Sequence, residues 1–346
     1  MKKRCTKCIM SESFPGISFD DQGVCSFCND KSIFQTEETA IQNAQKQINQ
    51  LISDVKKNGH TYDAVMLYSG GKDSTYTLSL AVNRYKLRVL SFTLDNGYIP
   101  DQTFKNITTV TDALGVDNII FRPSKENMKS IIKASALNAV YHKRTMMRIS
   151  SVCNSCISMV NLQALRIAIE KNIPMILAGF TLGQIPVNSI VYKNNYTFLE
   201  ESRTKSLSVL RDLTGDWLDD YFSIPKELLA KVTSWPDMVN LLCLEKITEE
   251  QIVEAISKFG WRPPENVDGC SSNCQLNTFN NYIHEQVFGY NPYELELSQI
   301  IRKGLLDRDT AISKVETMLP DVYERIADDL KITQNELERA KQNYRK

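Results

Sequence analysis

One short stretch, residues 64–75, constrains the fold of this chain more than any other. The apolar run 64–68 has the character of a buried strand, and it leads directly into a turn with two adjacent glycines. A Ser/Thr pair suited to helix capping then precedes a helix expected at 76–85. A strand end, backbone amides freed by glycine and a helix N-terminus together predict an anion site, for which phosphate is the natural ligand. The residues of this turn are Ser69, Gly70, Gly71, Lys72, Asp73, Ser74 and Thr75.

The turn is not a Walker A loop. That loop needs a glycine upstream of its Gly-Lys pair and a Ser or Thr after the lysine, and Met66 and Asp73 occupy those positions here. The order SGGKDS resembles the signature of the PP-loop ATP pyrophosphatases. The resemblance implies that ATP and Mg²⁺ bind at residues 69–75, that ATP is cleaved to AMP and pyrophosphate, and that Lys72 and Asp73 are catalytic. The simpler alternative is a generic strand-turn-helix unit.

Strand and helix patterns alternate after this turn. Strands are expected at 88–94, 118–122 and 173–178, and helices at 102–114, 125–140 and 158–171. This alternation predicts an α/β fold, a parallel sheet with helices on both faces and ligands at the carboxyl ends of its strands. The resemblance implies the adenine nucleotide alpha hydrolase-like version of this fold. Nucleotide-binding residues are accordingly expected after the other strands, at Thr93, Asp95, Asn96, Gly97, Gly179 and Thr181.

The N-terminal segment carries two CxxC pairs, Cys5 with Cys8 and Cys25 with Cys28. Pairs at this spacing are typical of a zinc ribbon, in which four thiolates hold one structural Zn²⁺. So small a segment buries little apolar surface, so the metal would supply its folding energy. Four unliganded cysteines are the alternative.

A second group consists of Cys153, Cys156, Cys270 and Cys274. Paired cysteines on loops suit a second zinc or an iron–sulfur cluster. The arrangement resembles the iron–sulfur tRNA thiolases of the PP-loop family, and it implies a [4Fe–4S] cluster on three of these cysteines, with Cys153 and Cys156 catalytic. A redox pair or unliganded cysteines are the alternatives. Cys243 is expected in the core.

Four regions follow from these patterns. We expect the zinc ribbon at 1–34, a linker helix at 35–60, the PP-loop domain at 61–215 and a helical substrate region at 216–346. The last region is interrupted by several prolines and holds all three tryptophans.

Charge and hydropathy favour a cytoplasmic enzyme without a membrane segment. No apolar run approaches about 18 residues, and no signal-like segment follows the first residues. Lys plus Arg number 41 and Asp plus Glu also number 41, so no global basic field indicates nucleic acid.

Beyond the loop, the sequence resembles the N-acetyl sugar amidotransferases. The resemblance rests on the N-terminal segment 4–25 and, more loosely, on the tail around 288–290 and 301–308. It implies amidation of a nucleotide-linked N-acetyl sugar in surface polysaccharide biosynthesis, with ammonia from a separate glutaminase subunit.

The second cysteine group departs from those enzymes and leaves two alternatives open. One is sulfur transfer to a tRNA base or small molecule, with a sulfur donor as partner. The other is a non-catalytic zinc-ribbon adaptor that binds nucleotides. A homodimer is compatible with each of these functions.

Overall fold

The centre of the protein is a six-stranded sheet with the strand order β3-β2-β1-β4-β6-β5. The computed structural model describes residues 2–345, without the side chains of 33, 34, 198, 202–206 and 343–345. Every neighbouring pair is parallel except β5 and β6, which are antiparallel. The expected class, α/β with a mostly parallel sheet, is therefore confirmed. The strands are β1 (Ala64–Leu67), β2 (Val89–Leu94), β3 (Asp117–Phe121), β4 (Met175–Ala178), β5 (Val191–Lys193) and β6 (Asp237–Asn240).

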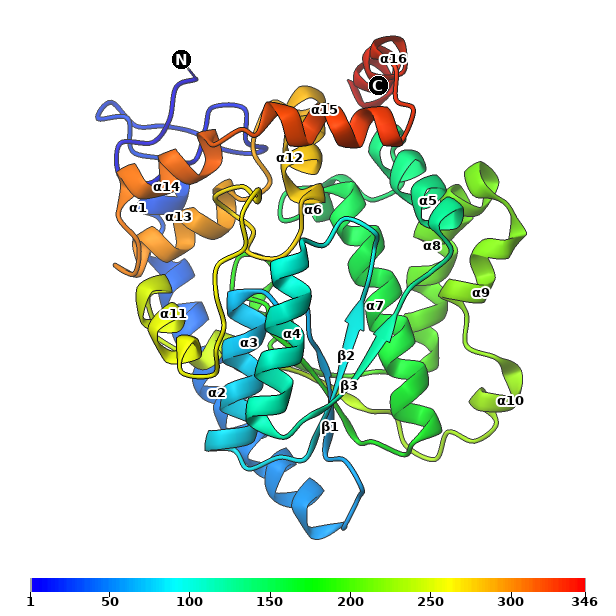
Figure 1. Cartoon of the computed structure of the whole chain (residues 1–346). Helices are drawn as coiled ribbons and strands as arrows, with labels where there is room; N and C mark the ends of the chain where they lie inside the picture. Colours follow the sequence, from blue (N-terminus) through cyan, green and yellow to red (C-terminus); the bar gives the residue numbers. More distant parts are fainter. Residues whose placement is uncertain (1, 346) are drawn as a thin grey trace.

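Helices cover both faces of the sheet because alternate residues of β1 point to opposite sides. Val65 and Leu67 pack toward α7 (Ser151–Glu170), whereas Ala64 and Met66 pack toward α3 (Lys72–Ser79) and α4 (Asp101–Leu114). Figure 1 shows α3 and α4 on one side of the strands and α7 on the other.

The remaining helices extend this core. The longest helix, α2 (Lys31–Lys57), lies between the N-terminal cysteine segment and the sheet, where a linker helix was expected. A π-helical turn, Leu80–Arg84, continues α3. The other α-helices are α1 (Ser26–Asn29), α2 (Lys31–Lys57), α5 (Lys125–Leu137), α6 (Lys143–Met146), α8 (Tyr196–Thr214), α9 (Asp219–Phe222), α10 (Lys226–Leu229), α11 (Glu249–Ser257), α12 (Leu276–Phe288), α13 (Glu294–Arg302), α14 (Arg308–Glu316), α15 (Pro320–Asp329) and α16 (Gln334–Arg345).

Three local expectations were wrong. Helix α3 begins at Lys72, because Gly71 is its N-cap, so Ser74 and Thr75 lie inside its first turns. Helix α7 begins at Ser151, with the Ser150 side chain accepting from the Cys153 amide, so Cys153 and Cys156 lie on a helix rather than a loop. The sheet also continues past residue 215, because β6 pairs with β4. Four residues are too few to show a strand period in the sequence.

Within residues 2–345, helix α7 is the one helix that meets the length and hydropathy criteria for a membrane span. In the fold it contacts β1, β2 and β4 on one side and α5 and α12 on others. The apolar composition of α7 fits a helix in the centre of the fold, because such a core helix can meet the same length and hydropathy criteria as a membrane span.

The N-terminal cysteine segment docks on α13 and α14, as Figure 1 shows. The Arg308 guanidinium donates to the carbonyl oxygens of Cys5 and Cys8, at 3.0 Å from Nη2 and Nε respectively. The buried Glu294 carboxylate accepts from Arg4 at 3.0 Å and from the Ser11 amide at 2.9 Å. These contacts join the two ends of the chain.

Trp261, from the segment after α11, supports the turn at the end of β1. Its side chain is 4% exposed, and Nε1 donates to the Gly70 carbonyl at 2.9 Å. Gly70 has a φ of +73°, and a Cβ there would lie 2.7 Å from Ile107 Cγ1. Only glycine adopts this conformation without strain, so the turn is held from both sides.

We expect Trp261→Phe to reduce the free energy of unfolding by about 1–3 kcal/mol, because the Gly70 carbonyl loses a buried donor. Because the affected carbonyl lies in the anion turn, binding of a non-hydrolysable ATP analogue should also weaken. Urea unfolding and calorimetric titration measure the two effects. Trp217→Phe is the matched control, since its Nε1 donates to Thr214 away from the turn. Unchanged analogue binding in Trp261→Phe would show that this contact does not shape the anion turn.

Candidate functional site

A cavity of about 1400 Å³ lies at the carboxyl ends of the strands. Residues at the ends of four strands line it, namely Leu67 and Ser69 after β1, Leu94 and Asn96 after β2, Ala178 and Gly179 after β4, and Asn240 of β6. This is the position at which ligands bind in open α/β sheets. The expected convergence of the strand ends on one crevice is therefore present.

The anion turn forms one part of the cavity wall, with Ser69, Gly71, Asp73 and Ser74 lining it. Ser69 Oγ lies 3.0 Å from Ser74 Oγ, which closes the turn across its base. Gly179 lies so close that a Cβ there would be 3.0 Å from Ser74 Cα. The glycines let backbone approach backbone at the N-terminus of α3, where amide groups favour a bound anion.

A loop from the C-terminal part of the chain covers this helix N-terminus. The Lys72 amide donates to Ser272 Oγ at 2.9 Å, and a Cβ on Gly71 would lie 3.0 Å from both Ser272 Oγ and Asn273 Oδ1. The hydroxyl thus occupies a hydrogen-bonding position that a phosphate oxygen would take at such a terminus. No local motif in the sequence indicates Ser272.

Lys72 belongs to a charged cluster beside the turn. Its Nζ lies 2.7 Å from the Asp73 carboxylate and 3.6 Å from that of Glu249, which also binds Lys314 at 2.9 Å. Burial opposes the ammonium form, but the neighbouring Asp73 and Glu249 charges outweigh it and raise the pKa of Lys72. Lys72 is therefore a stable cation at the edge of the site.

The residues expected after β2 and β4 have different surroundings. Thr93 is fully buried and donates to the Tyr68 carbonyl at 2.7 Å. Asp95 is buried and paired with Arg122, and it accepts from the Gly97 amide at 2.9 Å. Of the residues expected after β2 only Asn96 is among the cavity-lining residues, and of those expected after β4 only Gly179 is. These side chains hold the strand ends in place, and a role of their backbone in adenine binding stays a prediction.

The hydrogen-bond partner of Thr181 is Glu296, a residue that the sequence did not indicate. The Thr181 hydroxyl donates to Glu296 Oε1 at 2.7 Å, while Glu296 Oε2 has no hydrogen-bond partner among the described residues. Glu296 lies on α13 and is 6% exposed. Burial raises its pKa to about 7, with Thr181 opposing the shift and the Asp73 charge adding to it. The charged cluster thus contains a carboxyl group that titrates near neutrality.

Three cysteines of the second group converge on the cavity. Burial raises the pKa of Cys156 well above its usual value, and the neighbouring Cys153 and Cys274 charges add to the shift. Asn280 donates to Cys153 Sγ at 3.1 Å, and Asn96 donates to Cys274 Sγ at 3.3 Å. Amide donors of this kind stabilise thiolates and tune cluster potentials.

Cys270 differs from these three. It also lines the cavity, but its Sγ donates to the Lys314 carbonyl at 3.6 Å. Burial raises its pKa, and the charges that act on it belong to Asp268, Glu296, Lys314 and Lys72 rather than to a cysteine. The structure therefore separates Cys270 from the set of Cys153, Cys156 and Cys274. The sulfurs of Cys153, Cys156 and Cys274 do not all lie within 4.8 Å of one another.

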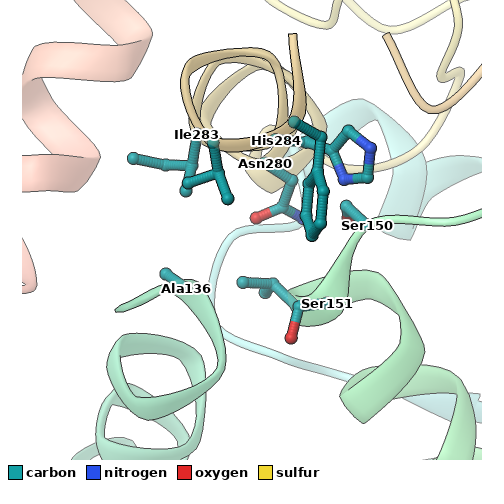
Figure 2. A pocket seen from close by; sticks show the side chains of 9 residues that line it. Ala136, Ser150, Ser151, Asn280, Ile283 and His284 are labelled. Carbon is teal, nitrogen blue, oxygen red and sulfur yellow. The ribbon is translucent and has the colours of Figure 1, made fainter. Parts of the chain in front are cut away.

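A small pocket of about 20 Å³ lies behind Cys153, where α12 meets the start of α7 (Figure 2). Ser151 Oγ, Asn280 Oδ1 and His284 Nε2 have no hydrogen-bond partner among the described residues. Burial lowers the pKa of His284 to about 3, so this ring is neutral. The pocket has room for one water molecule.

The four N-terminal cysteines come together as the spacing predicts. Within the described part of the chain they are the one group of at least three His, Cys, Asp or Glu ligand atoms that all lie within 4.8 Å of one another. Cys5 and Cys28 sulfurs are 4.0 Å apart, and those of Cys8 and Cys25 are 3.7 Å apart. A tetrahedral zinc site with bonds of about 2.3 Å needs sulfurs about 3.8 Å apart. The donor set suits a metal ion, and zinc remains our prediction.

We expect Glu296→Gln to remove a pH dependence of folding. The native pKa of about 7 lies above the ordinary value of 4.5, so this carboxyl stabilises the fold fully below pH 4.5, and the contribution is lost as the pH rises through 7. The wild type should therefore lose up to about 3 kcal/mol over this window relative to the variant. Urea unfolding at several pH values measures the difference.

Glu324→Gln, an exposed change on α15, is the control and should leave the profile unchanged. If the free energy of unfolding changes with pH in the same way in wild type and Glu296→Gln, Glu296 is not the titrating group.

Part of the chain matches a known protein family. Residues 63–180 match the phosphoadenosine phosphosulfate reductase domain family. An uncharacterized protein of Methanocaldococcus jannaschii is 21% identical over 331 residues, which cover 95% of this chain and 98% of that protein.

Two solved structures show a loose likeness. The U34-tRNA thiolase NcsA from Methanococcus maripaludis, with its [4Fe-4S] cluster, has a TM-score of 0.36 at 14% identity and covers 96% of this chain and 100% of its own. NMN synthetase from Francisella tularensis has a TM-score of 0.37 at 12% identity and covers 85% and 97%. These low scores carry no functional argument. The match to the reductase domain family covers residues 63–180, and the anion turn after β1 lies within it.

Proposed function

We propose that the protein is an ATP pyrophosphatase that adenylylates a second substrate and replaces its oxygen with nitrogen. The observation that carries this proposal is an anion turn that opens into a cavity of about 1400 Å³. Pockets for one small ligand are typically about 300–1000 Å³, so this cavity has room for ATP and an acceptor together. The resemblance of residues 4–25 to N-acetyl sugar amidotransferases supports a nucleotide-linked N-acetyl sugar as that acceptor.

The turn fits the phosphates of ATP. Gly70 and Gly71 leave no room for a Cβ, and a phosphate oxygen would take the place of Ser272 Oγ at the Lys72 amide at the start of α3. Asp73 lines the cavity and is the carboxylate suited to hold Mg²⁺, which neutralises phosphate charge when bound. Lys72, kept cationic by its neighbours, adds positive charge where pyrophosphate leaves.

The reaction has two steps. The acceptor oxygen attacks the α-phosphorus, a phosphorus–oxygen bond forms, and pyrophosphate departs. Ammonia then attacks the activated carbon, AMP leaves with the original oxygen, and the nitrogen gives up a proton. A separate glutaminase subunit would supply ammonia.

The cleavage products test the first step. With acceptor present, labelled ATP should yield AMP and pyrophosphate, because attack occurs at the α-phosphorus. We expect Asp73→Asn to reduce this turnover by about 100-fold with the fold intact. Asp309→Asn, on the exposed start of α14, is the matched control. ADP and phosphate as products would exclude a PP-loop pyrophosphatase, and ATP binding without any cleavage would favour a non-catalytic adaptor.

Sulfur transfer to a tRNA base or small molecule is the second candidate. The convergence of Cys153, Cys156 and Cys274 at the cavity supports it, because these thiols can hold an iron–sulfur cluster beside the acceptor. A sulfur donor would then replace the glutaminase.

Metal analysis after anaerobic purification separates the two functions. Amidation predicts one zinc per chain, lost in Cys28→Ser because the tetrahedral set is broken. Sulfur transfer predicts in addition about four irons per chain, lost in Cys274→Ser. Cys243→Ala is the control for both, since Cys243 donates to the Phe180 carbonyl in the core and should leave metal content unchanged. Iron that is present in the wild type and lost in Cys274→Ser would favour sulfur transfer over amidation. Zinc retained in Cys28→Ser would contradict the ribbon site.

A further inference from the structure

One wall of the cavity carries arginine side chains without carboxylate partners. Arg144, Arg148 and Arg302 all line the cavity, and none forms an ion pair within the part of the chain that the structure describes. Several arginines elsewhere are paired with acids, as in the pairs of Arg4 with Glu294 and Arg88 with Asp63.

Two of these arginines are fixed beside α13. Arg148 Nη1 donates to the Gly183 carbonyl at 2.8 Å, and a Cβ on Gly183 would lie 2.6 Å from Glu296 Cα. The Gly183 turn is thus pressed against α13, which ends at Arg302. Met147, adjacent to Arg148, packs in the cluster that joins the N-terminal cysteine segment to α13. We call this surface, formed by Arg148 and Arg302, the arginine wall.

Glu37 acts on Arg148 through its charge but forms no ion pair with the arginine wall. Glu37 also lines the cavity, but its carboxylate is bound by Lys303 at 3.1 Å and by Gln299. Arg302 Nη1 is buried and has no hydrogen-bond partner among the described residues. The Arg302 charge acts on Cys28, but no acidic side chain in the described part of the chain pairs with its guanidinium, and a phosphate is a bidentate partner that this geometry suits.

From these contacts we propose that the arginine wall binds the phosphate groups of the second substrate, a small nucleotide diphosphate-linked molecule that lies beside ATP. This rests on the proposed function and adds the chemical class of the group by which the acceptor is bound. The site is inside a cavity, and the chain has equal numbers of basic and acidic residues. Both features favour a small anionic ligand over the backbone of an RNA.

Calorimetric titration of the full-length protein, loaded with α,β-methylene-ATP, with UDP-N-acetylglucosamine tests the proposal. We expect Arg302→Gln and Arg148→Gln each to weaken binding of this probe by about tenfold or more, because a charge-assisted pair is lost. Binding of α,β-methylene-ATP should stay unchanged. Arg339→Gln, an exposed change on α16, is the matched control.

Arg148 also holds the Gly183 turn, so Arg302→Gln carries the test if Arg148→Gln does not fold. Equal probe binding by wild type and Arg302→Gln would overturn the proposal, as would a wild type that does not bind the probe. Binding of total tRNA that depends on Arg302, without probe binding, would assign the wall to RNA instead. Probe binding that depends on Arg302 in a protein that forms no AMP would support the phosphate site while refuting the proposed reaction.

Discussion

The close contact between the Gly70–Gly71 turn and the C-terminal half of the chain is the constraint on which the rest of the site depends. Trp261 holds the Gly70 carbonyl, and Ser272 binds the Lys72 amide directly beside Gly71. A β-carbon at either glycine would collide with these neighbours or with α4. The anion turn is therefore completed by residues about 190–200 positions later in the chain. Loss of this packing would open the N-terminus of α3 to water and weaken its preference for an anion.

The same C-terminal region also connects the N-terminal cysteine segment to the cavity. Arg308 and Glu294 bind the backbone and side chains of that segment, and α13 carries Glu296 and Arg302 toward the cavity. A metal on the four N-terminal cysteines would therefore stabilise one wall of the site as well as its own ribbon. This gives a physical reason for a structural metal in a chain whose chemistry lies elsewhere.

Two sets of groups lie at the cavity. Asp73 and the charged cluster around Lys72 lie at the anion turn, whereas Cys153, Cys156 and Cys274 lie where α7 and α12 meet. The first set suits activation by ATP, and the second suits soft-metal or sulfur chemistry. Under either proposed function the cavity would hold a common first half-reaction, and the second half-reaction would differ.

The anion turn and the four N-terminal cysteines were evident from the sequence, because each depends on residue types at short, fixed spacings. The strand alternation likewise indicated a mostly parallel sheet, although β6 was too short to be recognised. Only the tertiary structure brought Ser272 and the arginine wall to the cavity and Glu296 to Thr181, and only it separated Cys270 from the other cysteines. Their roles depend on burial and on contacts between distant segments, which no local pattern encodes. The sequence by itself predicted where an anion would bind, and the packing of α13 decided what else surrounds that position.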